Sequence, residues 1–449
     1  MIQLREQKTE VRPQRSDIRG PKTEGGGPTS KVRDRTSEIR DQRSKTRPLS
    51  SAICPPGLSV SLLTGGSDKP YALGIATALS SARVAVDFIG SDELDLAELH
   101  KLPQLRFLNL RGDQSPEASF PRKIARVARY YWRLIGYAAT ARPRVFHILW
   151  NNKFEFIDRV LLTFYYRLLG RRIVLTAHNV NIRKRDNCDS WFNRLSLRTQ
   201  YYLANHIFVH TEQMKSELVA DFGVPDSKTS VIPFGINNTV PNSSITAVDA
   251  KRALGVRSNN KVMLCFGQIA PYKGLQYVVN AFSELAKRDE SYRLIIAGKV
   301  KHGQTEYWNE IRRKIAGSGV QNQIVVRMEH VPDEEVELYF KAADVLIVPY
   351  LNIFQSGVPF LAYGFGLPVI ATDVGSLRQD IVEGRTGFVC RPHDSSDLAR
   401  VIDKYFESEL FRDLENRRLE IKEHANERYS WNKVAAIITA VYCNLLSSQ

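Results

Sequence analysis

The stretch VPYLNIFQSGVPFLAYGFGLPVIATDVG, residues 348–375, decides the fold class of this chain. It is typical of a strand, a loop, a compact helix, a second strand and a turn that ends in glycine. Doubly wound domains present a ligand crevice in this way, outside the carboxyl ends of parallel strands. The loop that faces the crevice carries no carboxylate, so the question is what such a loop binds.

Strands alternate with helical segments on both sides of this stretch. The first series contains LSVSLL, VFHILW and RIVLTAHN, and the alternation restarts after residue 240 with KVMLCFGQ, YRLIIAG and DVLIVPY. Such alternation predicts parallel sheets that are covered by helices. We therefore expect an α/β fold with two Rossmann-like doubly wound domains that face each other across a cleft.

The segment VIPFGINNTVPNSS, rich in Pro, Gly, Asn and Ser, separates the two series and predicts a hinge. The last helix, expected over residues 432–446, carries apolar residues on one side, and we expect it to pack back on the first domain. The predicted organisation is a disordered basic tail over 1–55, a first domain over 56–238, a second domain over 239–428 and a C-terminal helix over 429–449.

The composition is that of an ordinary globular protein, with a formal net charge of +15 that suits an anionic ligand or surface. The tail is either an arm for nucleic acid or membrane, or a disordered extension without a binding role. No secretory signal and no apolar run long enough to cross a bilayer is present, so we expect a cytoplasmic protein. The five cysteines form no C-x-x-C pair, and no metal site is predicted.

The segment FGQIAPYKGLQYVVNAF, residues 266–282, predicts a phosphate site. A strand ends, the chain turns, and Lys273 and Gly274 open a helix. A lysine supplies a point charge and the first helical N–H groups supply oriented donors, which together suit a phosphate. The alternative is an exposed surface lysine in a turn.

Several motifs resemble the retaining nucleotide-sugar glycosyltransferases of family 4, which have the GT-B fold. They are GQIAPYKG, LIIAGK, ADVLIVPY, GLPVIATDVGSLRQDIVEGRTGFV and RYSWNKVA, with LTAHNV, VHTEQMKSEL and VIPFGIN in the first half. The similarity covers residues 57–445. It implies an acceptor-binding first domain, a second domain that binds a UDP- or GDP-linked sugar as co-substrate, and no metal or other cofactor.

The match is incomplete at the donor site. The family's phosphate-binding Arg-x4-Lys pair falls on Gln268 and Lys273, so the lysine is present and the arginine is not. The family's Glu-x7-Glu pair falls on Ile353 and Leu361, and both carboxylates are absent. The resemblance implies a same-face displacement in which the leaving phosphate helps to deprotonate the acceptor, so these losses leave transfer possible through positioning and diphosphate stabilisation.

The loop before the compact helix still offers backbone N–H groups to a phosphate or a sugar hydroxyl. We expect Ser356, Gly357 and Val358 to bind the donor in this way, with the glycine permitting a close approach.

Three further positions complete the candidate site. The resemblance assigns His178 a contact with the donor sugar; the alternative is a loop histidine that satisfies backbone groups. Gly66, after the first strand, matches the loop that lines the acceptor and phosphate side, although glycines are also ordinary turn residues. His330, in the loop RMEHVPDEE, matches the side of the site where the base is bound.

Residues 121–144 contain seven basic residues and no acidic one, and the apolar residues recur at steps of three and four. Such a basic amphipathic helix can lie on anionic lipid, which predicts peripheral association with the inner face of a membrane. The alternative is that the apolar side packs on the sheet and the arginines are solvated.

The function that we expect is transfer of a sugar from a nucleoside-diphosphate sugar to a glycan or lipid-linked acceptor, with retention of anomeric configuration. The alternative is a non-catalytic GT-B module that binds a nucleotide sugar or a protein partner. Nucleic acid is not an expected partner, because aromatic and base-reading motifs are lacking.

Overall fold

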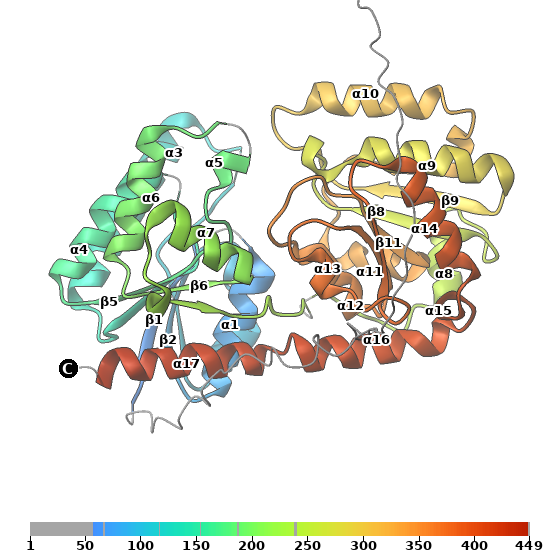
Figure 1. Ribbon diagram of the computed structural model, residues 1–449. Helices are drawn as coiled ribbons and strands as arrows, with labels where there is room; N and C mark the ends of the chain where they lie inside the picture. Colours follow the sequence, from blue (N-terminus) through green and yellow to red (C-terminus); the bar gives the residue numbers. More distant parts are fainter. Residues whose placement is uncertain are drawn as a thin grey trace, which may run out of the picture. The chain divides into compact units, whose positions relative to one another are not determined.

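The computed structural model of the chain describes residues 57–65, 68–115, 117–152, 154–185, 188–237 and 240–447. The predicted tail over 1–55, Gly66 and the predicted boundary between residues 238 and 239 lie outside these described residues. The described strands form one sheet of seven strands and one of six, and all strand pairs are parallel (Figure 1). The α/β fold class with two Rossmann-like domains is therefore confirmed.

The first sheet has the strand order β3-β2-β1-β4-β5-β6-β7. Its strands are β1 (Ser59–Leu63), β2 (Ala85–Gly90), β3 (Leu105–Asn109), β4 (Val145–Ile148), β5 (Arg172–Thr176), β6 (His206–Val209) and β7 (Thr229–Val231). The helices of this part are α1 (Lys69–Ser81), α2 (Ala97–His100), α3 (Phe120–Thr140), α4 (Thr163–Leu168), α5 (Ile182–Arg185), α6 (Trp191–Leu203) and α7 (Glu212–Phe222). Two separate apolar clusters form its core, as expected for a sheet that is covered on both faces.

The second sheet has the strand order β10-β9-β8-β11-β12-β13. Its strands are β8 (Lys261–Phe266), β9 (Tyr292–Ala297), β10 (Ile324–Arg327), β11 (Val345–Val348), β12 (Val369–Thr372) and β13 (Gly387–Cys390). The helices are α8 (Ala247–Ala253), α9 (Leu275–Arg288), α10 (Thr305–Ala316), α11 (Asp333–Ala342), α12 (Gly357–Gly364), α13 (Leu377–Asp380), α14 (Ser395–Glu407), α15 (Glu409–Arg412) and α16 (Leu414–Arg428). One apolar cluster holds this sheet and its helices together.

The last described helix, α17 (Trp431–Ser447), packs on the first domain beside α1 (Figure 1). Its apolar side, which includes Val434 and Ile438, belongs to the same buried cluster as strands β1 and β2. The hydroxyl of Tyr442 on α17 lies 2.6 Å from Nδ1 of His147 on β4. At its start, the indole N–H of Trp431 donates to the Ile236 carbonyl. The helix is therefore part of the core of the first domain.

The basic amphipathic helix is α3, and only part of its apolar side is covered. Tyr130, Leu134 and Ala138 are buried against the first sheet, whereas Ile124 and Ile135 are 54% and 40% exposed. The alternative interpretation, in which the apolar side packs on the sheet, therefore holds for the three buried residues and not for Ile124 and Ile135. The helical run before β5 is not uniform, because a π-helical segment, η2 (Ile157–Leu162), directly precedes α4.

None of the helices in the described segments combines the length and the apolar character that are needed to cross a membrane.

Candidate active site

The strand order places the candidate site. In each sheet the winding reverses at one point, between β1 and β4 in the first sheet and between β8 and β11 in the second. Ligands of open α/β sheets bind outside the carboxyl ends of the strands at such a point. The loops that follow β8 and β11, residues 267–274 and 349–356, therefore flank the candidate site of the second domain.

These two loops are held together by backbone contacts. The N–H of Leu351 donates to the carbonyl of Tyr272 over 2.8 Å. Gly274 has a φ of +66°, and a Cβ at this position would lie 2.0 Å from the carbonyl oxygen of Pro349. Only glycine allows both the left-handed backbone and this close approach. The predicted Lys273–Gly274 turn is therefore fixed against the loop that follows β11.

Lys273 lies at the end of a short 3-10 turn, Pro271–Lys273, and its side chain is held by Tyr350. The ammonium Nζ donates to the Tyr350 hydroxyl over 2.8 Å and lies 4.7 Å from the centre of that ring. Burial works to lower the pKa of Lys273, but Tyr350 and Tyr272 outweigh burial and leave the pKa raised. The lysine is charged at neutral pH, and it is not the solvated surface lysine of the alternative interpretation.

Tyr350 also connects Lys273 to the start of α12. Its hydroxyl lies 3.4 Å from Oγ of Ser356, and Ser356 accepts a hydrogen bond from the N–H of Val358 as the N-cap of the helix. The N–H groups at a helix start carry partial positive charge and favour anions. By contrast, the first N–H of α9, that of Leu275, donates to the Tyr307 hydroxyl. The Leu275 N–H is thus engaged within the domain, whereas the lysine network leads to the start of α12.

Three residues occupy positions where the family has an arginine or a glutamate, and their surroundings differ. Gln268 is exposed. Ile353 and Leu361 are each 8% exposed, and Leu361 lines a cavity. Two apolar side chains therefore stand where the family has carboxylates. Gln355, in the same loop, donates over 3.3 Å to the buried carboxylate of Asp380, so the nearby acid is part of an internal network.

A cavity of about 360 Å³ lies beside the start of α12. It is lined by Gly357, Val358 and Leu361, by the start of α1 with Asp68 and Tyr71, and by linker residues that include Phe234. Residues of α1, of α12 and of the segment that connects the two domains thus line one cavity. Sequence reasoning had proposed Gly357 and Val358 as binding residues, and it had not found Asp68, which adds a carboxylate to the lining.

His178, just past β5, is half-buried and forms a hydrogen-bonded pair with His210. Nδ1 of His210 lies 3.3 Å from the Ile232 carbonyl, and its Nε2 lies 3.1 Å from Nδ1 of His178. A carbonyl only accepts, so we assign the proton of His210 to Nδ1, and His178 then donates from its own Nδ1. This leaves Nε2 of His178 as an acceptor, and that atom is buried without a hydrogen-bond partner.

Both rings are neutral. Burial lowers the pKa of His210 to about 4, and burial together with the neighbouring His210 lowers the pKa of His178 well below its usual value. His178 also stacks flat on Trp150, with ring centres 4.1 Å apart. The ring is therefore fixed and uncharged, and its Nε2 can accept a hydrogen bond only from a group that enters the buried space beside it.

The ring of Phe234 lies near both His178 and the start of α12. Its ring centre lies 6.4 Å from that of His178, and it stacks on Phe360 of α12 at 5.4 Å. A Cβ on Gly357 would lie 3.5 Å from the same ring. The structure thus brings His178 and the loop before α12 to one aromatic side chain. Sequence reasoning missed Phe234, Tyr350 and His210, since nothing local marks them.

The remaining predicted positions are not joined to this arrangement. His330 is exposed after β10, the edge strand of the second sheet, and among the described residues no hydrogen bond or ion pair links it to Lys273. Gly66 lies outside them. The neighbouring Gly65 follows β1, where an added Cβ would lie 2.4 Å from the Trp150 carbonyl oxygen. Within the described segments, no group of three or more His, Cys, Asp or Glu residues is arranged to hold a metal ion.

Comparison with protein families matches the two halves of the chain separately. Residues 70–239 match Glycosyltransferase Family 4, and residues 260–408 match Glycosyl transferases group 1. Together with the fold, these matches show that the chain is a glycosyltransferase of the GT-B class.

Among curated proteins, the chain is similar to D-inositol 3-phosphate glycosyltransferases. It is 26% identical to that of Corynebacterium efficiens over 287 residues, which are 62% of this chain and 66% of the relative, just under two thirds. It is 25% identical to that of Corynebacterium glutamicum over 405 residues, which are 86% of this chain and 93% of the relative.

Two solved structures share the fold. The crystal structure of Anabaena HepE in complex with UDP has a TM-score of 0.64 and 18% identity, and covers 88% of this chain and all of HepE. Sucrose-phosphate synthase from Thermosynechococcus elongatus has a TM-score of 0.67 and 17% identity, with 87% and 100% covered. At these identities the likeness concerns the fold alone.

Proposed function

We propose that the protein transfers a sugar from a UDP- or GDP-linked donor to a glycan or lipid-linked acceptor, with retention of anomeric configuration and without a metal. The observation that carries the proposal is the contact of the Lys273 ammonium with Tyr350, which leads to Ser356 and the N–H groups of α12. A fixed cation next to a helix start suits a diphosphate leaving group. HepE, which shares the fold, has been crystallised with UDP and with UDP-glucose.

In this proposal Lys273 and the α12 N–H groups bind the diphosphate and take up the charge that develops when the bond to the sugar breaks. The acceptor hydroxyl attacks from the same face, and its proton passes to the departing phosphate oxygen. No protein nucleophile takes part. His178 accepts a hydrogen bond from a donor-sugar hydroxyl through Nε2 and so positions the sugar. Gln268 and Gly274 lie beside the phosphates, and His330 and Gly66 are the predicted contacts on the base and acceptor sides.

The second candidate function is a module that binds a nucleotide sugar or a protein partner without transfer. It is favoured by Ile353 and Leu361, where buried apolar side chains replace the family's carboxylates. Binding to an anionic membrane and a location at the inner membrane face are further parts of the proposal.

A panel of UDP- and GDP-sugars, with NMR of the product anomer, tests the proposal. His178→Phe keeps a flat ring on Trp150 but removes the acceptor nitrogen. We expect kcat to fall by about 10- to 100-fold, as for loss of one hydrogen bond to a reacting group, while the Kd for UDP stays the same. Donor binding without turnover by the wild type across the panel would favour the binding module instead, and an inverted product would contradict retention.

A further inference from the structure

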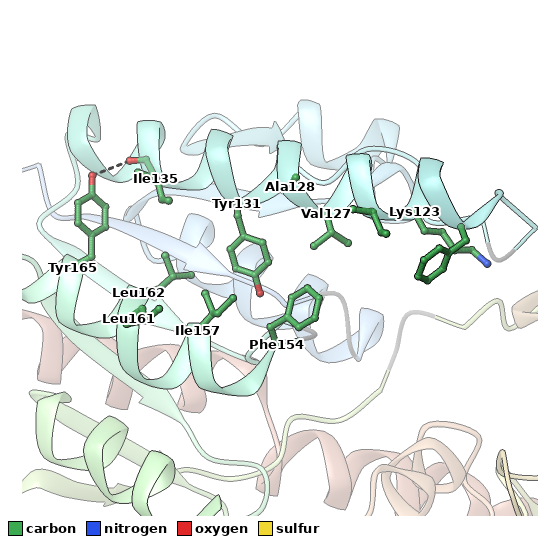
Figure 2. A pocket seen from close by; sticks show the side chains of 12 residues that line it. Lys123, Val127, Ala128, Tyr131, Ile135, Phe154, Ile157, Leu161, Leu162 and Tyr165 are labelled. Carbon is green, nitrogen blue, oxygen red and sulfur yellow. Dashed lines mark hydrogen bonds between the residues drawn. The ribbon is translucent and has the colours of Figure 1, made fainter. Parts of the chain in front are cut away.

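An open apolar groove lies on the first domain between α3 and the segment formed by η2 and α4 (Figure 2). We call it the α3–α4 groove; its volume is about 860 Å³. Its walls are aliphatic and aromatic side chains, among them Ile124, Val127 and Ile135 of α3 and Ile157 and Leu161 of η2. The groove exists because Tyr130, Leu134, Tyr137 and Ala138 hold α3 on the sheet, while Ile124 and Ile135 on the apolar side stay exposed.

The polar atoms at the groove are engaged within the protein. Tyr131 donates through its hydroxyl to Oδ1 of Asp158 over 2.9 Å. Tyr165 donates to the carbonyl of Ile135 over 3.2 Å (Figure 2). Both tyrosines thus present ring carbon to the groove and fix its two walls relative to each other. A hydrocarbon chain fits such a lining better than a peptide or a sugar, each of which brings polar groups that need partners.

The exposed apolar surface extends beyond the groove. Of the 18 large apolar side chains that are exposed in the described residues, 14 lie between Phe120 and Tyr202. They come from α3, η2, α4 and α6 and the segments beside them, and Trp132 and Trp191 are 79% and 76% exposed. α6 is part of the same face, because Phe192 of α6 stacks on Phe156 at 5.2 Å. Apolar patches of this extent mark a binding surface.

The same segment carries most of the net positive charge. Residues 120–202 contain 17 Lys and Arg against 4 Asp and Glu, a net charge of +13 in a chain of +15. On α3, Arg122, Arg129 and Arg133 lie outside the lining of the groove, and they form no hydrogen bond or ion pair with any described residue. Arg126, also outside the lining, lies 4.0 Å from Asp113. The apolar face is thus bordered by cations that are not neutralised within the described part of the chain.

We propose that this face docks on an anionic lipid bilayer and that an acyl chain of a bilayer lipid enters the α3–α4 groove. The arginines of α3 meet lipid phosphates, while the exposed tryptophans lie at the headgroup level, where amphipathic rings are favoured. A membrane satisfies both features at once, since it offers hydrocarbon directly beneath a layer of negative charge. The inference rests on the membrane association that is part of the proposed function, but not on the transfer reaction. It extends the prediction for α3 to a surface built from α3, η2, α4 and α6.

Flotation of the full chain with vesicles tests the proposal. The vesicles contain phosphatidylcholine alone, or two parts phosphatidylcholine to one part phosphatidylglycerol. We expect binding to the anionic vesicles and weak binding to the neutral ones. Replacing Arg122, Arg129 and Arg133 by Gln together should weaken binding by at least tenfold, and by roughly 100-fold if each arginine contributes its full value near a charged surface.

A matched pair of double variants tests the groove itself. Ile124→Asp with Leu161→Asp places charge on exposed groove residues and should abolish flotation. Val248→Asp with Leu419→Asp, which changes two exposed apolar residues of the second domain, should leave flotation unchanged. Circular dichroism checks that each variant is folded. Lipids with brominated acyl chains should quench the fluorescence of Trp132 when the protein binds. The contribution of Trp132 is the quenching that is lost in Trp132→Phe.

Three results would overturn the proposal. One is no flotation of the wild type with anionic vesicles. Another is equal binding to neutral and anionic vesicles, since this would remove the role of the arginines. The third is a dimer, seen by sedimentation of the wild type, that the Ile124→Asp and Leu161→Asp pair dissociates while vesicle binding persists, because a second copy would then occupy the face.

Discussion

Replacing Lys273 by Met should weaken the binding of a nucleoside diphosphate and leave the binding of the nucleoside unchanged. Methionine keeps the length of the side chain and removes the ammonium. In the structure, one of the three N–H donors of Lys273 is directed at Tyr350, so the others remain for a phosphate. Loss of one charge-assisted hydrogen bond costs about 1.5–3 kcal/mol. This corresponds to an increase of about 10- to 150-fold in the Kd for UDP.

Tyr350→Phe tests whether the lysine is positioned by its partner. The variant keeps the ring and removes one neutral hydroxyl, which costs about 0.5–1.5 kcal/mol and corresponds to an increase of about 2- to 10-fold in Kd. Lys287→Met, an exposed lysine in the last turn of α9, serves as the control and should bind UDP as the wild type does. Isothermal titration with UDP and with uridine separates the phosphate contribution from that of the base.

The reasoning is refuted if Lys273→Met binds UDP as tightly as the Lys287 control. It is also refuted if the affinities for UDP and uridine fall together, because the lysine would then act on the fold of the site and not on the phosphates. GDP and guanosine provide the same comparison if the protein prefers a guanine nucleotide.

Gly274→Ala should lower the free energy of unfolding by more than 2 kcal/mol, because a Cβ at φ +66° would also lie 2.0 Å from the Pro349 carbonyl oxygen. The control is Gly255→Ala, at φ +71° with no atom within 4 Å of the added Cβ, which should lower the free energy of unfolding by only about 1 kcal/mol. Urea unfolding measures this free energy for both variants, and equal losses would contradict the close approach of Gly274 to Pro349. Acid should destabilise the fold between about pH 6.5 and pH 4, since burial lowers the pKa of His147 to about 3 and that of His210 to about 4. The unfolded chain binds more protons in this window, so stability is present above it and falls on the order of 2–3 kcal/mol per histidine as the pH drops through it. Urea unfolding at several pH values should show this slope, and His147→Gln should flatten it; an unchanged slope would exclude His147 as a source.

The fold could be predicted because its signals are local. Buried strands such as those of β5, β8 and β11 appear as short apolar runs, and the helices between them are visible from their period. The position of Lys273 was equally local, because a lysine that follows a buried strand and precedes a helix lies at the carboxyl edge of the sheet. These inferences need no knowledge of the tertiary contacts between the elements.

The partners of the site could not be found in this way. Tyr350 is 77 residues from Lys273 in the chain, and His210 is 32 residues from His178. A pattern at one position carries no information about such pairs. For α3, the period shows which residues share a side, but not whether Leu134 and Ile135 are covered. The structure shows that the first is buried and the second is 40% exposed.

The docking of α17 has a consequence for the order in which the protein is made. This helix follows the whole second domain in the chain, yet it fills a core beside β1 and β2 and bonds to His147 through Tyr442. On the ribosome the first domain therefore emerges with one apolar surface still open, and it stays open until every residue up to α17 has been synthesised. Nascent chains that stop after α16 should leave the first domain vulnerable to proteases and dependent on chaperones, although all of its strands are present.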